Sequence, residues 1–421
     1  MSARHPLIWS PPFIAIVLVS INMRLTIASV GPLLEEIATS EGMRLAALGA
    51  LGAVPMLTWA LLSPLMHRLG ERFGMHRTVA WSLILLAAGT ALRSLAGSPI
   101  NLWLGTAIIG AALAAGNVLM PAIIKREFDD RAPFVMGAFS STVAIAGAIA
   151  SGIVIPLAGI QVAGQELGWR WTLLSFGLAI PVALVAWSWA FRNRDVRPPM
   201  RGGADAASAT ADGPGAEHRP DSGRRVWGEA LAWQIAIYMG AQSTIFYTLL
   251  TWLVAMEAAQ GRSATLAGLD TMVIQIVCVA GSAATPALYR GRLVRWLPAV
   301  LPVPLLVACV GIIVAPSLIV LWAAMTGLGL GATFTMSITL IAVRTRTHGD
   351  ASALSGMAQS AGYTLAAAGP ILFGWLLAAS GGWTLPMLLL TAIGAAQVVA
   401  GALAGRPRRL FERATVRPPA G

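Results

Sequence analysis

Charged residues are scarce in this chain of 421 residues, since Asp, Glu, Lys and Arg together make up 11% of it. A soluble domain carries about 25% charged residues, because water must solvate its surface. Apolar residues make up 57% of the chain, and its mean hydropathy is +0.73. The scarcity of charge excludes a soluble globular protein and predicts a protein that lies in a lipid bilayer.

Cysteine is almost absent, and several sequence motifs of enzymes are missing. Cys278 and Cys309 both lie in apolar stretches, which excludes a disulfide framework and a cysteine-based metal site. We find no nucleotide-binding loop with a lysine, no zinc motif and no Ser/His/acid arrangement. These absences argue against an ATP-driven pump and against a hydrolytic enzyme, and we expect no cofactor and no metal.

Lysine is also nearly missing, since Lys125 is the only one among 29 basic residues. The net charge of +11 alone would suit a nucleic-acid-binding protein. However, the charges lie in short segments between apolar runs, which excludes nucleic acid as a partner. With a cytoplasmic N-terminus, the outer side receives only Arg44, Arg93, Arg170 and Arg262. By the positive-inside rule, this bias predicts a multi-pass protein of the cell inner membrane with both termini in the cytoplasm.

Apolar stretches long enough to cross a bilayer recur along the whole chain. A span needs about 20 apolar residues, so the chain has room for about twelve. We predict spans at 11–37, 43–66, 77–97, 101–124, 133–156, 171–191, 228–256, 264–289, 297–315, 318–343, 352–379 and 383–405. The expected fold class is therefore an all-α membrane protein with about twelve transmembrane helices.

A segment of different composition divides the chain. Residues 193–226 are rich in Gly, Ala, Pro, Asp and Arg, which predicts a flexible cytoplasmic linker. Residues 1–192 would then form an N-terminal six-helix bundle, and residues 227–421 a C-terminal six-helix bundle with a short cytoplasmic tail. Matching positions in the two halves, such as Gly137 and Gly356, suggest parallel repeats.

Arg24 lies deep in the first predicted span, roughly 20 Å along the helix. A guanidinium near the middle of a bilayer costs at least about 2.5–3.5 kcal/mol and cannot lose its proton. We predict no acidic residue at comparable depth. Either an anionic or electronegative solute meets Arg24, or carbonyls and amides such as those of Asn22 and Gln242 hold it. The usual role of intramembrane charge favours the solute.

Polar side chains in other spans are candidates for binding the same solute. Gln359 and Tyr363 are four residues apart and share a helix face. Gln242 and Tyr247 could border a broad cavity, and Asn117 lies in the fourth span. Amides and hydroxyls can hydrogen-bond a small polar solute, although hydrogen bonds between spans would explain them equally well.

Charged residues near the span ends suggest gating and proton coupling. Glu71 and Arg72, between the second and third spans, are candidates for a cytoplasmic gate. Asp270, near the outer end of the eighth span, is the candidate for proton coupling. Since Asp270 is not at the midplane, uniport and exchange remain alternatives to proton coupling. Whether protons are a partner therefore stays open.

Several stretches resemble the major facilitator superfamily, in particular its branch of cyanate permeases and nitroimidazole exporters. The loop around Glu71 is similar to the superfamily's Asp-Arg-x-Gly-Arg-Arg signature, with Glu71 in the place of Asp and with Met75 and His76 replacing basic residues. The more specific stretches are Asn22-Met-Arg24 with Ser29-Val-Gly31-Pro32, Leu119-Met-Pro121, Gly240-Ala-Gln242-Ser243 with Tyr247 and Trp252, and Leu354-Ser355-Gly356-Met-Ala-Gln359-Ser360-Ala-Gly362-Tyr363.

The resemblance implies the major facilitator fold, in which two six-helix bundles rock to give alternating access. It also implies a secondary active or facilitative transporter that is not an enzyme, and we expect a monomer. Its solute would be small and electronegative: a cyanate-like anion, a small carboxylate or a nitroaromatic. A multidrug efflux transporter and a transporter-like solute sensor are the alternatives. The site residues implied are Arg24, Asn117, Gln242, Tyr247, Gln359 and Tyr363.

Overall fold

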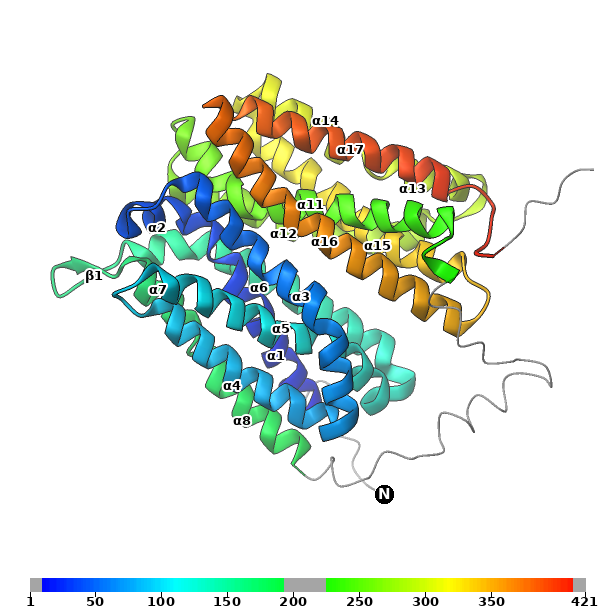
Figure 1. The fold of residues 1–421 in the computed structure, drawn as a ribbon, viewed down its shortest axis with the longest axis horizontal. Helices are drawn as coiled ribbons and strands as arrows, with labels where there is room; N and C mark the ends of the chain where they lie inside the picture. Colours follow the sequence, from blue (N-terminus) through cyan, green and yellow to red (C-terminus); the bar gives the residue numbers. More distant parts are fainter. Residues whose placement is uncertain (1–9, 193–224, 412–421) are drawn as a thin grey trace, which may run out of the picture.

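The computed structural model describes residues 10–192 and 225–411, which are almost entirely helical (Figure 1). The predicted linker and C-terminal tail therefore lie largely outside the described residues. In chain order the elements are α1 (Pro11–Ala28), η2 (Gly31–Leu33), α2 (Leu34–Glu41), α3 (Leu45–Phe73), α4 (Met75–Ser94), α5 (Pro99–Phe128), η3 (Asp129–Arg131), α6 (Ala132–Ala158), β1 (Gln161–Val162), β2 (Gln165–Glu166), α7 (Gly168–Phe176), α8 (Ala179–Phe191), α11 (Ala230–Ala259), α12 (Ala264–Leu288), η4 (Gly291–Arg295), α13 (Leu297–Val300), α14 (Val303–Val314), η5 (Pro316–Leu318), α15 (Ile319–Val343), α16 (His348–Ser380) and α17 (Thr384–Ala404).

Within the described ranges, 11 helical segments are long and apolar enough to cross a membrane. α11 is not among them, although it has 30 residues, because Gln, Ser, Thr and Tyr side chains lower its hydropathy. It is nevertheless the most enclosed helix, since every residue from Tyr238 to Glu257 is buried. The predicted all-α membrane fold is confirmed, and α11, the helix with these polar side chains, lies in the middle of the molecule.

Three predicted spans are each broken into shorter helices, and one of them, 171–191, divides into α7 and α8. The span predicted at 11–37 is divided by a turn after α1, followed by η2 and α2. Pro32 explains this break, because a proline lacks the amide hydrogen that a continuous helix needs and its ring clashes with the carbonyl four residues earlier. The span predicted at 297–315 divides in the same way around Pro302, between α13 and α14.

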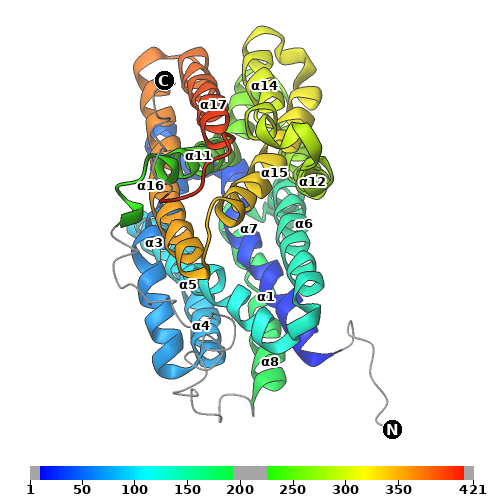
Figure 2. The same cartoon turned by 90° about the vertical axis from the view of Figure 1, so that its right-hand side faces the viewer.

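The two halves of the chain form two groups of long helices that meet at one end and diverge toward the other (Figure 1). We call the end where α1 begins and α17 ends the terminal end. The other end, which carries α2 and the β1–β2 hairpin, is the opposite end. Figure 2 gives the view from the terminal end, with α3 beside α16 and α6 beside α12.

Glycines allow the two halves to approach closely at the opposite end. A Cβ placed on Gly31 would overlap the carbonyl oxygen of Leu250 and lie 3.2 Å from the Cα of Thr251. A Cβ on Gly374 of α16 would lie 2.6 Å from the carbonyl oxygen of Ala46 in α3. Toward the terminal end, a Cβ on Gly137 or on Gly356 would meet nothing within 4 Å. The structure is thus closed at the opposite end.

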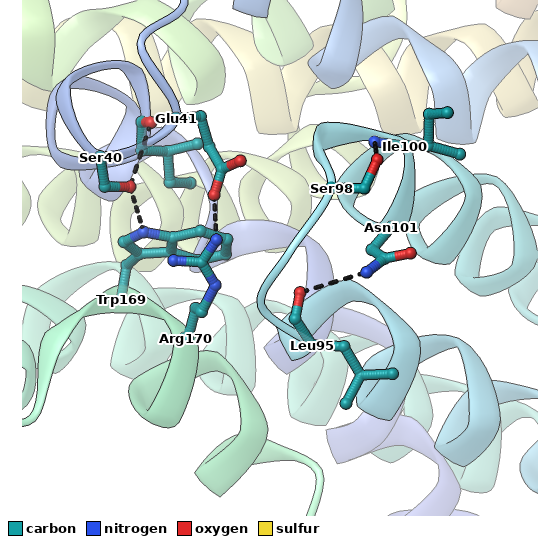
Figure 3. A network of polar contacts seen from close by, with 9 residues as sticks. Ser40, Glu41, Leu95, Ser98, Ile100, Asn101, Trp169 and Arg170 are labelled. Carbon is teal, nitrogen blue, oxygen red and sulfur yellow. Dashed lines mark hydrogen bonds and ion pairs between the residues drawn. The ribbon is translucent and has the colours of Figure 1, made fainter.

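Short contacts also join the loops of the opposite end (Figure 3). Trp169 of α7 donates its indole N–H to Ser40 at 2.6 Å and its backbone N–H to Glu36 at 2.7 Å. Arg170 forms an ion pair with Glu41 of α2. These bonds attach α2 to α7 and pair Arg170, an arginine predicted to lie on the outer side, with a carboxylate.

Arg93 differs from what its place in the sequence suggests. It belongs to the last turn of α4, yet it is only 1% exposed, so it is not a surface charge beside the membrane. The helix packing explains this burial, because a Cβ on Gly105 of α5 would lie 2.7 Å from the Cα of Arg93. Gly105 therefore lets α4 and α5 approach until the Arg93 side chain is enclosed.

Candidate functional site

Arg24 projects from α1 toward α11. Its Nη1 donates a hydrogen bond to the Tyr247 hydroxyl at 3.2 Å. Its guanidinium carbon lies 5.1 Å from the ring centre of Phe246 and 5.6 Å from that of Tyr247. Aromatic faces attract a cation by about 0.5–2 kcal/mol, which offsets part of the cost of burying the charge.

The guanidinium keeps unused hydrogen-bonding capacity. It has five N–H donors, and Tyr247 accepts from one of them. Within residues 10–192 and 225–411, no ion pair joins Arg24 to a carboxylate, and the side chains that interact with it electrostatically include Tyr247, Tyr363 and Cys278. The side chain is partly exposed rather than sealed in packing. Arg24 can therefore bind an electronegative group that enters the bundle.

An aromatic cluster surrounds this position and links three helices. The indole of Trp59 in α3 contacts the ring of Tyr247 edge-on at 5.8 Å between centres. The same indole contacts the ring of Tyr363 in α16 at 5.7 Å. The predicted residues Arg24, Tyr247 and Tyr363 are thus brought together, with Trp59 between the two tyrosines.

Gln275 of α12 and Arg24 both lie against Gly147 of α6, and Gln275 was not selected from the sequence. Its amide donates to the carbonyl oxygen of Gly147 and to the Ser151 hydroxyl of α6, both at 2.9 Å. A Cβ on Gly147 would overlap the Gln275 amide oxygen and lie 3.4 Å from Cγ of Arg24. The signal that could have found Gln275 is the one used for Gln242, a single amide in an apolar span.

The other predicted site residues lie outside this cluster. Gln242 is buried, and its amide oxygen accepts a hydrogen bond from Ser243 at 3.1 Å. Gln359 is exposed and donates to Ser355 at 2.9 Å, and Asn117 is exposed too. Asn22, considered above as a holder of Arg24, instead donates to the carbonyl oxygen of Leu18 at 2.8 Å.

The gating candidates lie at the terminal end, and the candidate for proton coupling lies at the opposite end. Asp270 is 3% exposed and pairs with Arg262 at 2.6 Å, while Glu257 approaches the same guanidinium at 3.3 Å. Asp270 is therefore one member of an ion-paired cluster at the opposite end. Glu71 and Arg72 are exposed at the end of α3, where Arg72 lies 5.2 Å from the ring centre of Phe73.

A membrane-embedded helical protein with one cation at its centre and aromatic and amide side chains around it has the architecture of a solute transporter. Residues 13–367 match the model of the Major Facilitator Superfamily. The chain belongs to this superfamily, and it is a transporter rather than an enzyme.

Comparison with known proteins agrees with the predicted branch of this superfamily. The chain is 34% identical to the 2-nitroimidazole transporter of Escherichia coli (strain K12), and the match covers 94% of this chain and 95% of that protein. It is 30% identical to the cyanate transport protein CynX of the same organism, with 88% and 91% covered. An inward-facing structure of a bacterial homologue of the human lysosomal transporter Spinster shares the fold, with a TM-score of 0.74, 17% identity and 94% and 96% of the chains covered.

Proposed function

We propose that this protein carries a small anionic or electronegative solute across the inner membrane, with Arg24 as the group that binds it. The observation that carries the proposal is a central guanidinium with free N–H donors and no carboxylate partner among the described residues. A cationic substrate would be repelled there, because charges interact strongly in a site with little water.

The solute class follows from the donor set and from the relatives. Arg24 offers N–H groups, while Trp59, Tyr363 and Phe246 offer flat faces. Nitro groups, carboxylates and small pseudohalide anions accept hydrogen bonds from a guanidinium, and aromatic solutes also stack on rings. The E. coli relatives are named for 2-nitroimidazole and cyanate, which belong to this class.

Access to the site would alternate between the two membrane faces. The basic residues favour a cytoplasmic terminal end, so the conformation described here, closed at the opposite end, would open to the cytoplasm. Residues 1–192 and 227–421 would then rock as two bundles about Arg24. Glu71 and Arg72 would contribute to closing the cytoplasmic side, and the Asp270 cluster is the place where protons would couple to transport.

The solute class is tested with purified protein in liposomes. We expect saturable uptake of at least one of 2-nitroimidazole, cyanate and benzoate, and no uptake of the lipophilic cation tetraphenylphosphonium above that of empty liposomes. Saturable transport of the cation with none of the other three would overturn the proposal and favour a multidrug exporter.

Tyr247→Phe tests how Arg24 is held. The variant keeps the ring over the guanidinium but removes the hydroxyl that accepts its hydrogen bond. Losing one such bond costs about 1 kcal/mol, so we expect solute affinity to fall roughly fivefold. Titration of the purified variant measures this, and Tyr247→Leu, which also removes the ring, should lose more. Equal affinity for Tyr247→Phe and the natural protein would show that the hydroxyl does not position Arg24.

A further inference from the structure

We propose that the terminal end of the C-terminal half binds an anionic phospholipid of the adjacent leaflet. The site consists of four exposed arginines, Arg225, Arg295, Arg406 and Arg408, and the exposed indole of Trp296. We call these residues the arginine patch. The patch concerns the membrane and not the solute, so the inference does not depend on the function proposed above.

Three segments that lie far apart in the chain meet at this patch. The helix η4 ends at Arg295, whose carbonyl oxygen would be overlapped by a Cβ on Gly405, so the end of α17 packs directly against η4. α13, which follows η4, lies beside the same end of α17 (Figure 1). Arg225 joins them from the start of the second half, with its guanidinium carbon 4.8 Å from the ring centre of Phe411.

The segment after α17 is attached to the protein at both ends. The backbone N–H of Leu410 donates to the carbonyl oxygen of Arg344 at 2.8 Å, and the Leu410 side chain is only 2% exposed. The Arg344 guanidinium donates to the carbonyl oxygens of Ala404 and Gly405 at 3.1 and 3.0 Å. The segment is thus fixed to the end of α15, which holds its two arginines of the patch in a defined position.

Neighbouring carboxylates do not neutralise the patch. The sequence has no Asp or Glu in residues 271–349 or in residues 351–411. The arginines of the patch form no ion pair in the part of the chain that the structure describes, and Glu229, at the start of α11, could offset at most one of their charges. A guanidinium binds phosphate strongly through parallel N–H bonds, so the patch suits a phosphate headgroup.

The terminal end of the N-terminal half differs in charge. There the exposed Arg126 and Arg131 lie close in the sequence to Glu127 and Asp129, around the turn between α5 and α6. Acidic and basic residues are mixed, as is usual for a solvated surface. The C-terminal half is therefore the one whose terminal end suits an anionic partner, and the N-terminal half supplies a comparison within the same protein.

Exposed apolar side chains continue from the patch along α13 and α14. The guanidinium carbon of Arg295 lies 5.0 Å from the ring centre of Trp296, which is 55% exposed. Val300, Val303 and Val307 follow it at helical spacing and are exposed as well. Tryptophan favours the headgroup level of a bilayer, and valine favours its hydrocarbon interior. The surface thus fits a headgroup at the arginines and an acyl chain along α14, which makes a phospholipid the partner rather than an acidic peptide.

The test is lipid binding to the purified full chain, measured by native mass spectrometry. We expect dioleoyl phosphatidylglycerol to bind at least about tenfold more tightly than zwitterionic dioleoyl phosphatidylcholine. Each arginine near a membrane surface contributes about fivefold in affinity for anionic lipid, so Arg295→Gln with Arg408→Gln should weaken phosphatidylglycerol binding about 25-fold. Arg126→Gln with Arg131→Gln removes the same charge from the N-terminal half and should bind as the natural protein does.

Two further variants separate the loss of charge from a general disturbance of the fold. Arg295→Lys with Arg408→Lys keeps the charge and should keep most of the binding, while Trp296→Ala keeps the arginines and should bind more weakly. Equal binding of the two lipids to the natural protein would overturn the proposal. So would equal losses in the Gln pair of the patch and the Gln pair of the N-terminal half, or an equal loss in the Lys pair. Displacement of the lipid by an equal concentration of inorganic phosphate would also overturn it, because the site would then be one for a free anion.

Discussion

Arg24→Gln is expected to abolish transport and at the same time to leave the protein as stable as before or more stable. The substitution removes the charge that lies against Phe246 and Tyr247, and with it the N–H donors proposed to bind the solute. Charge-assisted hydrogen bonds contribute about 1.5–3 kcal/mol each, so losing them should reduce uptake about 100-fold or more. Burying that charge costs at least about 2.5–3.5 kcal/mol, and glutamine avoids this cost.

The opposite signs of the two effects make the experiment decisive. Uptake into liposomes and the midpoint of thermal unfolding are measured on the same preparations of Arg24→Gln and Arg24→Lys. Arg344→Gln is the matched control, because Arg344 bonds the carbonyl oxygens of Ala404 and Gly405 and should lose stability without losing the binding site. If Arg24→Gln instead unfolded at a much lower temperature, Arg24 would have a structural role and the proposed binding role would be withdrawn.

The sequence located Arg24 because a charge inside an apolar span is visible without any knowledge of packing. Tyr247 and Tyr363 were predicted as polar side chains inside apolar spans and are implied by the resemblance as well, and the structure brings both to Arg24 through Trp59. Trp59 itself was not selected, since a tryptophan in an apolar helix is ordinary and only the approach of α3 to α16 gives it a role. Contacts between the two halves depend on their tertiary arrangement, which spacing within one span does not encode.

Arg93 was misplaced for a different physical reason. An arginine in the last turn of a span is inexpensive when it reaches the membrane surface, so its position alone suggests a solvated charge. Here Gly105 permits α4 and α5 to pack so closely that the side chain is enclosed beside Thr26. The break after Ala28 was missed in the same way, although Pro32 in the sequence was a sufficient signal for it.

Gly31→Ala is expected to prevent closure at the opposite end and so to stop the transport cycle. A single methyl group there would overlap the carbonyl oxygen of Leu250, which is backbone and cannot move aside as a side chain could. Packed interiors do not absorb such an overlap, so the cheapest relief is separation of the two halves. We expect uptake to fall more than about tenfold, while the protein still folds because the opened conformation removes the clash.

Cys278 provides a direct readout of this opening. It lies within electrostatic range of Arg24 and is partly exposed, whereas Cys309, the other cysteine, is fully buried. A membrane-impermeant thiol reagent added on the side of the opposite end should label Cys278 faster in Gly31→Ala than in the natural protein. Gly394→Ala is the matched control, since a Cβ there meets nothing closer than 3.4 Å, within one half. Unchanged labelling and full uptake in Gly31→Ala would contradict this prediction. They would mean that the contact between η2 and α11 at Gly31 is not the one that closes this end.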